Sequence, residues 1–536
     1  MKHARHTETS IGGHKLGKKT KQKRNYRDFN YSGIGDHQRV GKQLIPPLNN
    51  IPNSNSSSWR DDHAPEMLWA FLLAATFPRD EYLSCFRQII EWMRVTFPKV
   101  DQPADATPEN IPQGEEALND ACEFDHTSLA KLSDQYFKQF VNIVLAHPLG
   151  YGAFRPLLFI DSLPGIHRWR TEVGIEPSEQ DWQTLASAII ETLDHQSEKS
   201  TDVRWLKCAL GIVMGKIKFM HGMREHAEEI LFFPNKGDMR KVRPSIRAME
   251  MAFRRNPPMV WIELFWAELL TKTKCIDGSS ETDYFKLSPP ILTRDAILTA
   301  RNQLAQIFHA VTSSTRTDAK LDGAFGFTLY ALSILEEIAA PPYSQLLMGR
   351  IGLRSIAEVV ITFAYLVTKN SSLLWTAYRN FGIGQAKLAF LKMEQAVGDA
   401  PAFIDQETLF QIANEDTWQE FVNVDFGHWA NKNLRELATE ADKKDIYDRY
   451  YDWTSAFAHG HWCSIRDSNF VTCHNPLHRL HRIPRPYHRI MQSVIPDAVE
   501  LVNQTFDLLE ATYPTMNKLR RIKIVVSPSQ SIPEAI

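Results

Sequence analysis

The sequence predicts an all-α protein in which an N-terminal helical domain is followed by a C-terminal antiparallel helix bundle. From Trp59 onward, apolar residues recur at every third or fourth position, which is the period of an amphipathic helix. Several such segments in the second half exceed about 20 residues, and long helices of this kind favour a bundle. We find no pair of alternating segments separated by turn residues, so no sheet is expected.

Length and composition indicate a multi-domain globular protein. A chain of 536 residues is too long for one hydrophobic core, so two or three domains are expected. Hydrophobic residues make up 43% of the chain and charged residues 23%, which is the ordinary balance of a globular protein.

Residues 1–57 are predicted to form a basic disordered arm. They are rich in Gly, Lys, Asn, Ser and Pro and have almost no periodic apolar pattern. Residues 1–45 carry eleven Lys and Arg against only three acidic residues. Such an arm either tethers nucleic acid through its phosphate charge or serves as a solvating tail, and the sequence leaves both roles open.

The N-terminal helical domain is predicted over residues 58–272. Pro65 suits a first helical turn, where its missing N–H costs nothing, and Ser178 with Asp181 resembles the start of a capped helix. The periodic pattern places helices at residues 80–96, 127–146, 178–195, 202–220, 224–231, 244–254 and 258–272.

A polar stretch with Gly and Pro at residues 273–290 is predicted to link the two halves. The C-terminal bundle then spans residues 291–515, includes a His- and Arg-rich loop at 460–487, and is followed by a tail at 516–536. Its helices are expected at residues 292–313, 320–339, 343–368, 372–397, 405–424, 432–459 and 488–512.

The sequence indicates a cytoplasmic protein without a membrane span. The longest apolar run, which starts at Ile356, is shorter than the roughly 20 residues that cross a bilayer, and it contains Glu358. The basic N-terminus lacks the apolar stretch of a secretory signal. The six cysteines include no CxxC pair, a usage typical of a reducing compartment.

Two stripes of polar residues are candidates for an interior site of the bundle. Arg354 and Glu358 lie four residues apart in an apolar helix, and Tyr451, Ser455 and His459 follow the same spacing in a later helix that Gly460 ends. If the two helices are neighbours, these five side chains converge. The alternatives are a catalytic pocket and a structural network that fixes helix register.

The segments "LRSIAEVVITFAYL" and "YYDWTSAFAHG" resemble a bacterial all-helical family of unknown function. The shared motifs are Arg-x3-Glu in one helix and Tyr-x3-Ser-x3-His-Gly in a later one, over roughly residues 290–515. The chain is also distantly similar to the HEPN ribonucleases of bacterial defence and toxin systems, whose signature is Arg, four to six residues, then His on one helix. Arg449 lies too far before His459 to meet this spacing, and prolines interrupt the pair Arg482 and His488.

The segment 459–488 collects six of the nineteen histidines and two of the six cysteines. Cys463, Cys473, His474 and His478 have the ligand types of a zinc site, but their spacing differs from that of short zinc clips. We therefore expect neither a metal nor another cofactor. These four residues are kept as the candidate ligands.

The same segment is a candidate anion or nucleic-acid site. Its arginines and histidines can hold phosphate oxygens, and Trp462 and Tyr487 can stack on bases. The candidate contacts are His478, Arg479, His481 and Arg482, with Arg243 and Arg247 in a second basic patch. A solvated, proline-constrained connector explains the same composition.

Two functional hypotheses follow. In the first, a cytoplasmic bacterial protein of defence or stress acts on RNA or another phosphate ligand; His459 is the general acid or base, Arg354 stabilises charge on phosphorus, and Glu358, Tyr451 and Ser455 orient them. In the second, the polar network is structural and the protein is a non-catalytic scaffold that recruits a partner. The oligomeric state and the need for a partner protein stay open.

Overall fold

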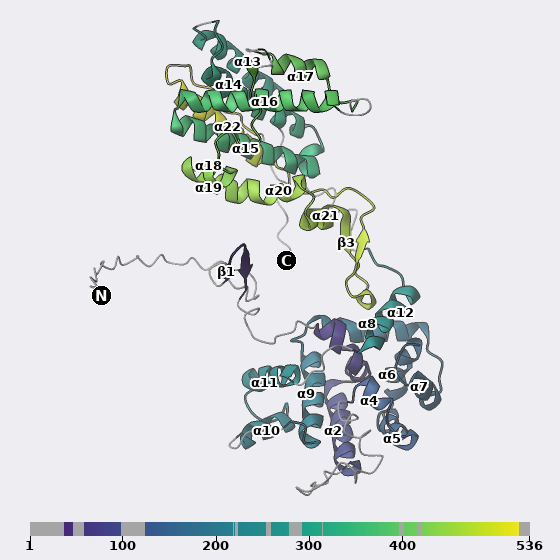
Figure 1. Cartoon of the computed structure of the whole chain (residues 1–536). Helices are drawn as coiled ribbons and strands as arrows, with labels where there is room; N and C mark the ends of the chain where they lie inside the picture. Colours follow the sequence, from purple (N-terminus) through teal and green to yellow (C-terminus); the bar gives the residue numbers. More distant parts are fainter. Residues whose placement is uncertain are drawn as a thin grey trace, which may run out of the picture.

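The computed structural model describes residues 37–46, 58–97, 124–217, 219, 223–252, 259–277, 292–313, 315–395, 401–415, 418 and 421–524. Over these residues the protein is all-α, as predicted, and its buried apolar side chains form two separate hydrophobic cores. Figure 1 shows the two groups of helices, with α21 and the strand β3 between them.

The N-terminal core is built from helices between residues 59 and 272. The bounds are α1 (Leu68–Thr76), α2 (Arg79–Thr96), α4 (His126–Leu129), α5 (Asp134–Leu145), α6 (Gly150–Phe154), α7 (Ile166–Val173), α8 (Glu179–Leu193), α9 (Glu198–Val213), α10 (Arg224–Leu231), α11 (Met239–Ala252) and α12 (Val260–Lys272). Helix α1 is buried almost all round, because its neighbours cover every face.

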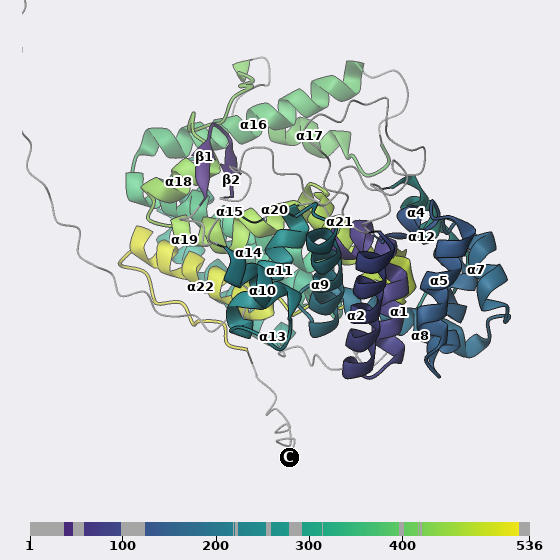
Figure 2. The ribbon, with the colours of Figure 1, turned by 90° about the horizontal axis from the view of Figure 1, so that it is seen from below.

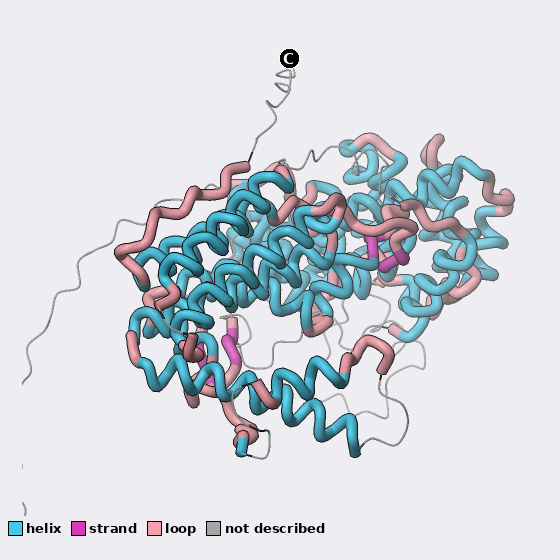
Figure 3. Tube along the Cα trace, turned by 90° about the horizontal axis from the view of Figure 1, so that it is seen from above, coloured by secondary structure: helices cyan, strands magenta, loops and turns pink. Residues whose placement is uncertain are grey.

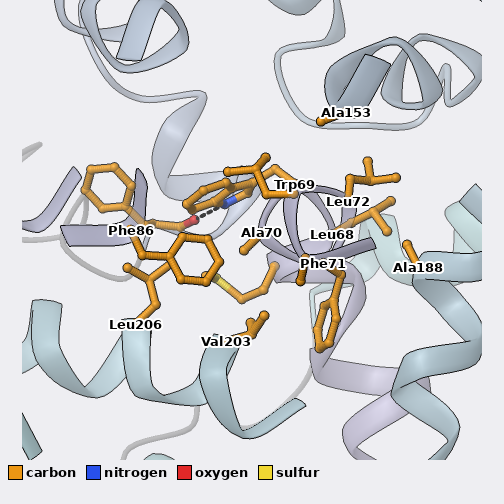
Figure 4. Close-up of a cluster of buried hydrophobic side chains, with 14 of the residues drawn as sticks. Leu68, Trp69, Ala70, Phe71, Leu72, Phe86, Ala153, Ala188, Val203 and Leu206 are labelled. Atoms are coloured by element: carbon orange, nitrogen blue, oxygen red, sulfur yellow. Dashed lines mark hydrogen bonds between the residues drawn. The ribbon is translucent and has the colours of Figure 1, made fainter. Parts of the chain in front are cut away.

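Trp69 of α1 lies at the centre of this core (Figure 4). Its indole N–H donates to the carbonyl of Phe124 at 2.8 Å, and its ring meets Phe86 and Phe140 edge to face. The hydrogen bond satisfies the one polar atom of a fully buried side chain, so the indole can be buried without an unpaired donor.

Buried charges tie α9 to its neighbours. Asp202, which is fully buried, accepts hydrogen bonds from the hydroxyl of Tyr82 at 2.6 Å and from Arg79 at 2.9 Å. Glu250 of α11, also fully buried, lies 3.4 Å from Arg204 and 3.6 Å from Lys207. Each carboxylate has a cationic partner, which a buried charge requires.

The C-terminal bundle packs α14 and α22 against α15, the most buried helix of this half. Figures 2 and 3 show its long helices lying side by side. The bounds are α13 (Arg294–Val311), α14 (Ala319–Ala339), α15 (Leu347–Lys369), α16 (Ser372–Gln395), α17 (Gln406–Ala413), α18 (Leu434–Glu440), α19 (Lys444–Ile446), α20 (Asp452–Ala458), α21 (Trp462–Asn469) and α22 (Ile495–Thr512).

Among the described residues, α15 is the one helix long and apolar enough to cross a membrane. In its most apolar 18-residue window, 61% is buried inside the protein. The core helix of a soluble protein passes the same test, so length and composition do not distinguish the two cases.

Several predicted helices are shorter or divided in the structure. The helix predicted at 127–146 is interrupted between α4 and α5, where Ser133 caps the second piece. The helix predicted at 432–459 is broken after α18, because Asp442 adopts a left-handed backbone conformation with φ 54°. The helix predicted at 405–424 ends at Ala413, and the one predicted from 488 begins at Ile495.

The expectation of no sheet is wrong for two short hairpins. β1 (Gln38–Val40) pairs with β2 (Gln43–Ile45) inside the predicted disordered arm, and β3 (Phe470–Thr472) pairs with β4 (Arg482–Pro484). Strands of three residues are too short to show an alternating pattern in the sequence. Apart from residues 37–46, the arm lies outside the described residues.

The hairpin β3–β4 reaches from the C-terminal half to the N-terminal core. Leu477, in the short turn Pro476–His478 between the two strands, is 3% exposed and belongs to that core. The backbone N–H of His474 donates to the carbonyl of Ile276 at 2.8 Å, and a β-bridge joins Cys473 to Asp277. Residues predicted within the bundle loop therefore pack against the end of α12.

A buried histidine makes the stability of the N-terminal core pH-dependent. His126 is fully buried against Trp169 and Trp261, and neither ring nitrogen has a hydrogen-bond partner in the described part of the chain. Burial lowers its pKa to about 3. The unfolded state therefore binds the extra proton first, and stability is fully present above about pH 6.5 and falls toward pH 3, by up to about 1.4 kcal/mol per pH unit.

We expect His126→Phe to flatten this slope in urea unfolding followed between pH 7 and pH 4. The exposed His167→Phe serves as the matched control and should keep the slope of the natural chain. Equal slopes for the natural chain and His126→Phe would contradict the assignment.

Candidate functional site

The guanidinium of Arg354 joins α15 to α20. It donates to the hydroxyl of Tyr451 at 2.8 Å and to the hydroxyl of Ser455 at 3.3 Å, and it lies 3.3 Å from the carboxylate of Glu358. The Arg354 side chain is only 18% exposed. Four of the five side chains predicted to converge therefore do so, as a network between two helices.

The relative direction of the two helical segments explains why Arg354 meets both Tyr451 and Ser455. Lys369 at the end of α15 pairs with Glu440 of α18 at 2.8 Å, while Arg354, nearer the start of α15, meets Tyr451 and Ser455. The chain from α18 to α20 therefore runs antiparallel to α15. Residues four apart on each helix then face the same partner.

His459 does not join this network. It is the C-cap of α20, where its backbone N–H donates to the carbonyl of Ser455, and its side chain is exposed. Within the described residues its ring makes no hydrogen bond, and its nearest aromatic neighbour is His461 at 6.1 Å between ring centroids. No side chain orients the imidazole, which a general acid or base needs.

Glu358 also faces a cavity of 530 Å³ between α14, α15 and α16. Burial and the charge of Glu358 raise the pKa of Tyr378 to about 12, and burial lowers the pKa of His428. Residue patterns in the sequence do not predict this cavity, because its walls come from four separate segments. The lining residues are Phe327, Tyr330, Ser355, Glu358, Val359, Thr362, Tyr378, Arg379, Phe381, Gly382, His428 and Trp429.

A cluster of arginines lies at the start of α15, on the side toward α21. We define the arginine cluster as Arg350, Arg466 and Arg489. Burial and the charge of Arg489 lower the pKa of Arg350 to about 10, and burial and the charge of Arg466 lower the pKa of Arg489. Arg489 therefore lies close enough to Arg350 on one side and to Arg466 on the other for like charges to repel.

The arginine cluster has one acidic partner among the described residues. Asp467 pairs with Arg489, while Arg350 donates to the backbone carbonyls of Ser344 and Gln492 and Arg466 has no ion pair. Arg485, at the start of the same segment, has a buried Nε without a hydrogen-bond partner in the described residues. Positive charge thus exceeds negative charge at this surface.

Aromatic side chains border the arginine cluster along the chain. Trp462, at the start of α21, is 67% exposed, and Tyr487, between Arg485 and Arg489, is 59% exposed. The segment follows the C-terminal end of α21, because the backbone N–H of Arg485 donates to the carbonyl of Asn469.

The residues predicted to contact nucleic acid are mostly engaged within the protein. Arg479 pairs with Glu263 at 3.0 Å, Arg243 pairs with Glu198 at 2.9 Å, and Arg247 donates to Thr201 at 3.3 Å. Arg482 is exposed and donates to Thr472 of the opposite strand. His478 is 4% exposed and His481 lies beside it, so neither forms an open phosphate-binding surface.

Two of the four candidate metal ligands do come together. Cys473 and His478 lie in one group with Cys275 and His481, and the four ligand atoms are within 4.8 Å of one another. Cys463, which is exposed, and His474 are outside this group. Sequence spacing missed Cys275 because it precedes the others by about 200 residues.

Residues 349–476 match DUF5677, described as a family of unknown function. The match begins just before Arg350 and ends before His478, so it includes nearly all of α15, the whole of α20 and the Arg354 network. This part of the chain is similar to an all-helical family of unknown function, as the motifs predicted. No curated protein and no solved structure matches the chain. The similarity to HEPN ribonucleases stays a prediction.

We expect Arg354→Met to destabilise the chain by roughly 1–3 kcal/mol, because it leaves the hydroxyl of Tyr451 and the carboxylate of Glu358 without their shared donor. The matched variant His459→Ala should change stability by less than about 0.5 kcal/mol, since the ring is exposed and makes no hydrogen bond. Urea unfolding measures both. Equal losses for the two variants would contradict the network described.

Proposed function

We propose that the C-terminal half binds single-stranded RNA at the arginine cluster and the exposed aromatic residues beside it. The observation that carries the proposal is the imbalance of charge: among the described residues, Asp467 is the one ion-pair partner of the arginine cluster, and it pairs with Arg489 alone. Like charges held close together and partly out of water destabilise the folded state unless an anion joins them.

The arginine cluster has N–H donors available for the oxygen atoms of a phosphate group. Arg466 keeps all its N–H groups available within the described residues, and Arg350 uses two of its five for backbone carbonyls. Planar guanidinium groups bind phosphate oxygens in pairs, which gives affinity without base recognition.

Single-stranded RNA is the phosphate ligand that also uses the exposed rings. Trp462 and Tyr487 lie on the two segments that carry Arg466 and Arg489, so a strand held by its phosphates can stack bases on them. Stacking of this kind contributes about 1–3 kcal/mol per base and tolerates any sequence. We therefore expect binding with little base preference.

The proposal is binding rather than cleavage. The guanidinium of Arg354 is occupied by Tyr451, Ser455 and Glu358, and among the described residues the ring of His459 has no orienting partner. The Arg354 network supports the surface by fixing α20, which leads directly into α21 and Arg466. The scaffold hypothesis explains the network equally well but offers no reason for the arginine cluster.

Fluorescence anisotropy of a labelled single-stranded RNA of mixed sequence, measured over a series of KCl concentrations, tests this proposal. Arg466→Gln should weaken binding several-fold and lower the slope of log K against log salt by about 0.7, because one phosphate contact is lost. Arg243→Gln, whose natural side chain pairs with Glu198, serves as the control and should leave both unchanged. A chain lacking residues 1–45 should show the same loss on Arg466→Gln.

Competition by inorganic phosphate and by duplex RNA separates the possible ligands. Displacement by phosphate at low millimolar concentration would favour a small phosphate ligand over a strand. Equal salt slopes for the natural chain and Arg466→Gln would remove the arginine cluster from any role in binding.

A further inference from the structure

We propose that Cys275, Cys473, His478 and His481 bind one zinc ion, which fastens the hairpin β3–β4 to the segment that follows α12. The four residues come from two parts of the chain, since Cys275 and His481 are 206 positions apart. This proposal is independent of RNA binding, because none of the four residues belongs to the arginine cluster.

The distances between the ligand atoms fit a tetrahedral site. Sγ of Cys473 lies 3.4 Å from Nδ1 of His478, and Sγ of Cys275 lies 3.3 Å from Nε2 of His481. Zinc bonds of about 2.3 Å to sulfur and 2.0–2.1 Å to nitrogen place sulfur and nitrogen ligands about 3.5 Å apart at tetrahedral angles. All four atoms lie within 4.8 Å of one another, so small side-chain movements close the site.

The hydrogen bonds around His478 fix which ring nitrogen carries the proton. The hydroxyl of Thr273 donates its proton to the carbonyl of Leu269 at 2.8 Å, so its oxygen can only accept from other groups. Nε2 of His478 lies 2.8 Å from that oxygen, so Nε2 carries the proton of the neutral ring when the ring donates this hydrogen bond. The lone pair of Nδ1 then faces Cys473, which is how a metal-binding imidazole is held by its second nitrogen.

Other contacts hold the segment after α12 in place around the same site. The side-chain amide of Asn475 donates to the carbonyl of Lys274 at 2.8 Å and to the hydroxyl of Thr273 at 3.2 Å. The backbone N–H of Ile276 donates to Sγ of Cys473 at 3.4 Å. Cys473 itself is fully buried.

The turn between His478 and His481 has a strained backbone, which the proposed zinc site explains. Arg479 and Leu480 both adopt left-handed backbone conformations, with φ 51° and 54°, although neither is glycine. A residue with a side chain rarely adopts this conformation, because its Cβ crowds the following carbonyl oxygen. The turn brings His481 back beside Cys275, and the backbone N–H of Cys473 donates to the carbonyl of His481 at 2.9 Å.

Zinc suits this group better than other common ions. Two sulfur and two imidazole ligands match the composition of structural zinc sites, whereas calcium and magnesium prefer oxygen. Four protein ligands leave no open position, which is the arrangement of a structural rather than a catalytic ion. We therefore expect the ion to stabilise the contact between the two halves of the protein.

Elemental analysis of the full chain, purified without chelators, should find about one zinc per chain. Cys473→Ser and His481→Ala should each lose most of it. Cys463→Ser and His474→Ala are matched controls from the same segment that lie outside the site, and they should keep full zinc content.

Cobalt titration of the natural chain after chelation keeps the test valid if a variant fails to fold. Tetrahedral cobalt with two thiolates should give its characteristic visible absorption at one equivalent, and zinc should displace it. No zinc in the purified chain together with no cobalt spectrum would overturn the proposal. A Cys275–Cys473 disulfide in mass spectrometry of the natural chain would overturn it as well.

Discussion

The return of the hairpin β3–β4 to the end of α12 is the contact on which the relation between the two halves depends. The two hydrophobic cores are separate, but Leu477 of the C-terminal half packs within the N-terminal core. Hydrogen bonds from His474 and Asn475 to Ile276 and Lys274 hold that insertion in place. The ion pair of Arg479 with Glu263 adds to this small interface, and the Cys and His side chains beside it supply a further link.

The hairpin β3–β4 and the segment after it connect the proposed zinc site to the arginine cluster. The segment that leaves β4 carries Arg485 and Arg489 along α21, and it reaches α15 where Arg350 donates to the carbonyl of Gln492. An ion at Cys473 and His481 would fix one end of that segment. The Arg354 network fixes the opposite side by holding α20 to α15. The proposed zinc ion and the Arg354 network therefore hold the arginine cluster in position without contacting it.

The sequence predicted the helices well where apolar periodicity was uninterrupted, as in α14 and α15. It failed where a single backbone conformation ended a helix, as at Asp442, because Asp also occurs inside helices and a left-handed residue leaves no periodic signal. The polar stripe of Arg354, Glu358, Tyr451 and Ser455 was predictable, since helix spacing alone brings residues four apart to one face. His459 shares that spacing but lies where α20 ends, so its ring projects into solvent.

Residue spacing in the sequence does not predict contacts between segments that are far apart in the chain. Cys473 and His478 were recognised as metal-ligand types, but the partner Cys275 lies in a stretch predicted to be a plain linker. Arg350 likewise lies near Arg489 only because residues 485–492 run past the start of α15. Local sequence patterns predict helices and the side of each helix on which a residue lies. Which helices and loops then pack against each other depends on tertiary structure.

X-ray absorption at the zinc edge of the full chain tests the central claim most directly, because it reports the ligands of the ion that joins the two halves. We expect the ligand shell of the zinc ion to contain two sulfur atoms at about 2.3 Å and two nitrogen atoms at about 2.0–2.1 Å, which requires Cys275 and Cys473 to meet in solution. A shell of oxygen and nitrogen atoms without sulfur would place the ion elsewhere and would contradict the proposed junction.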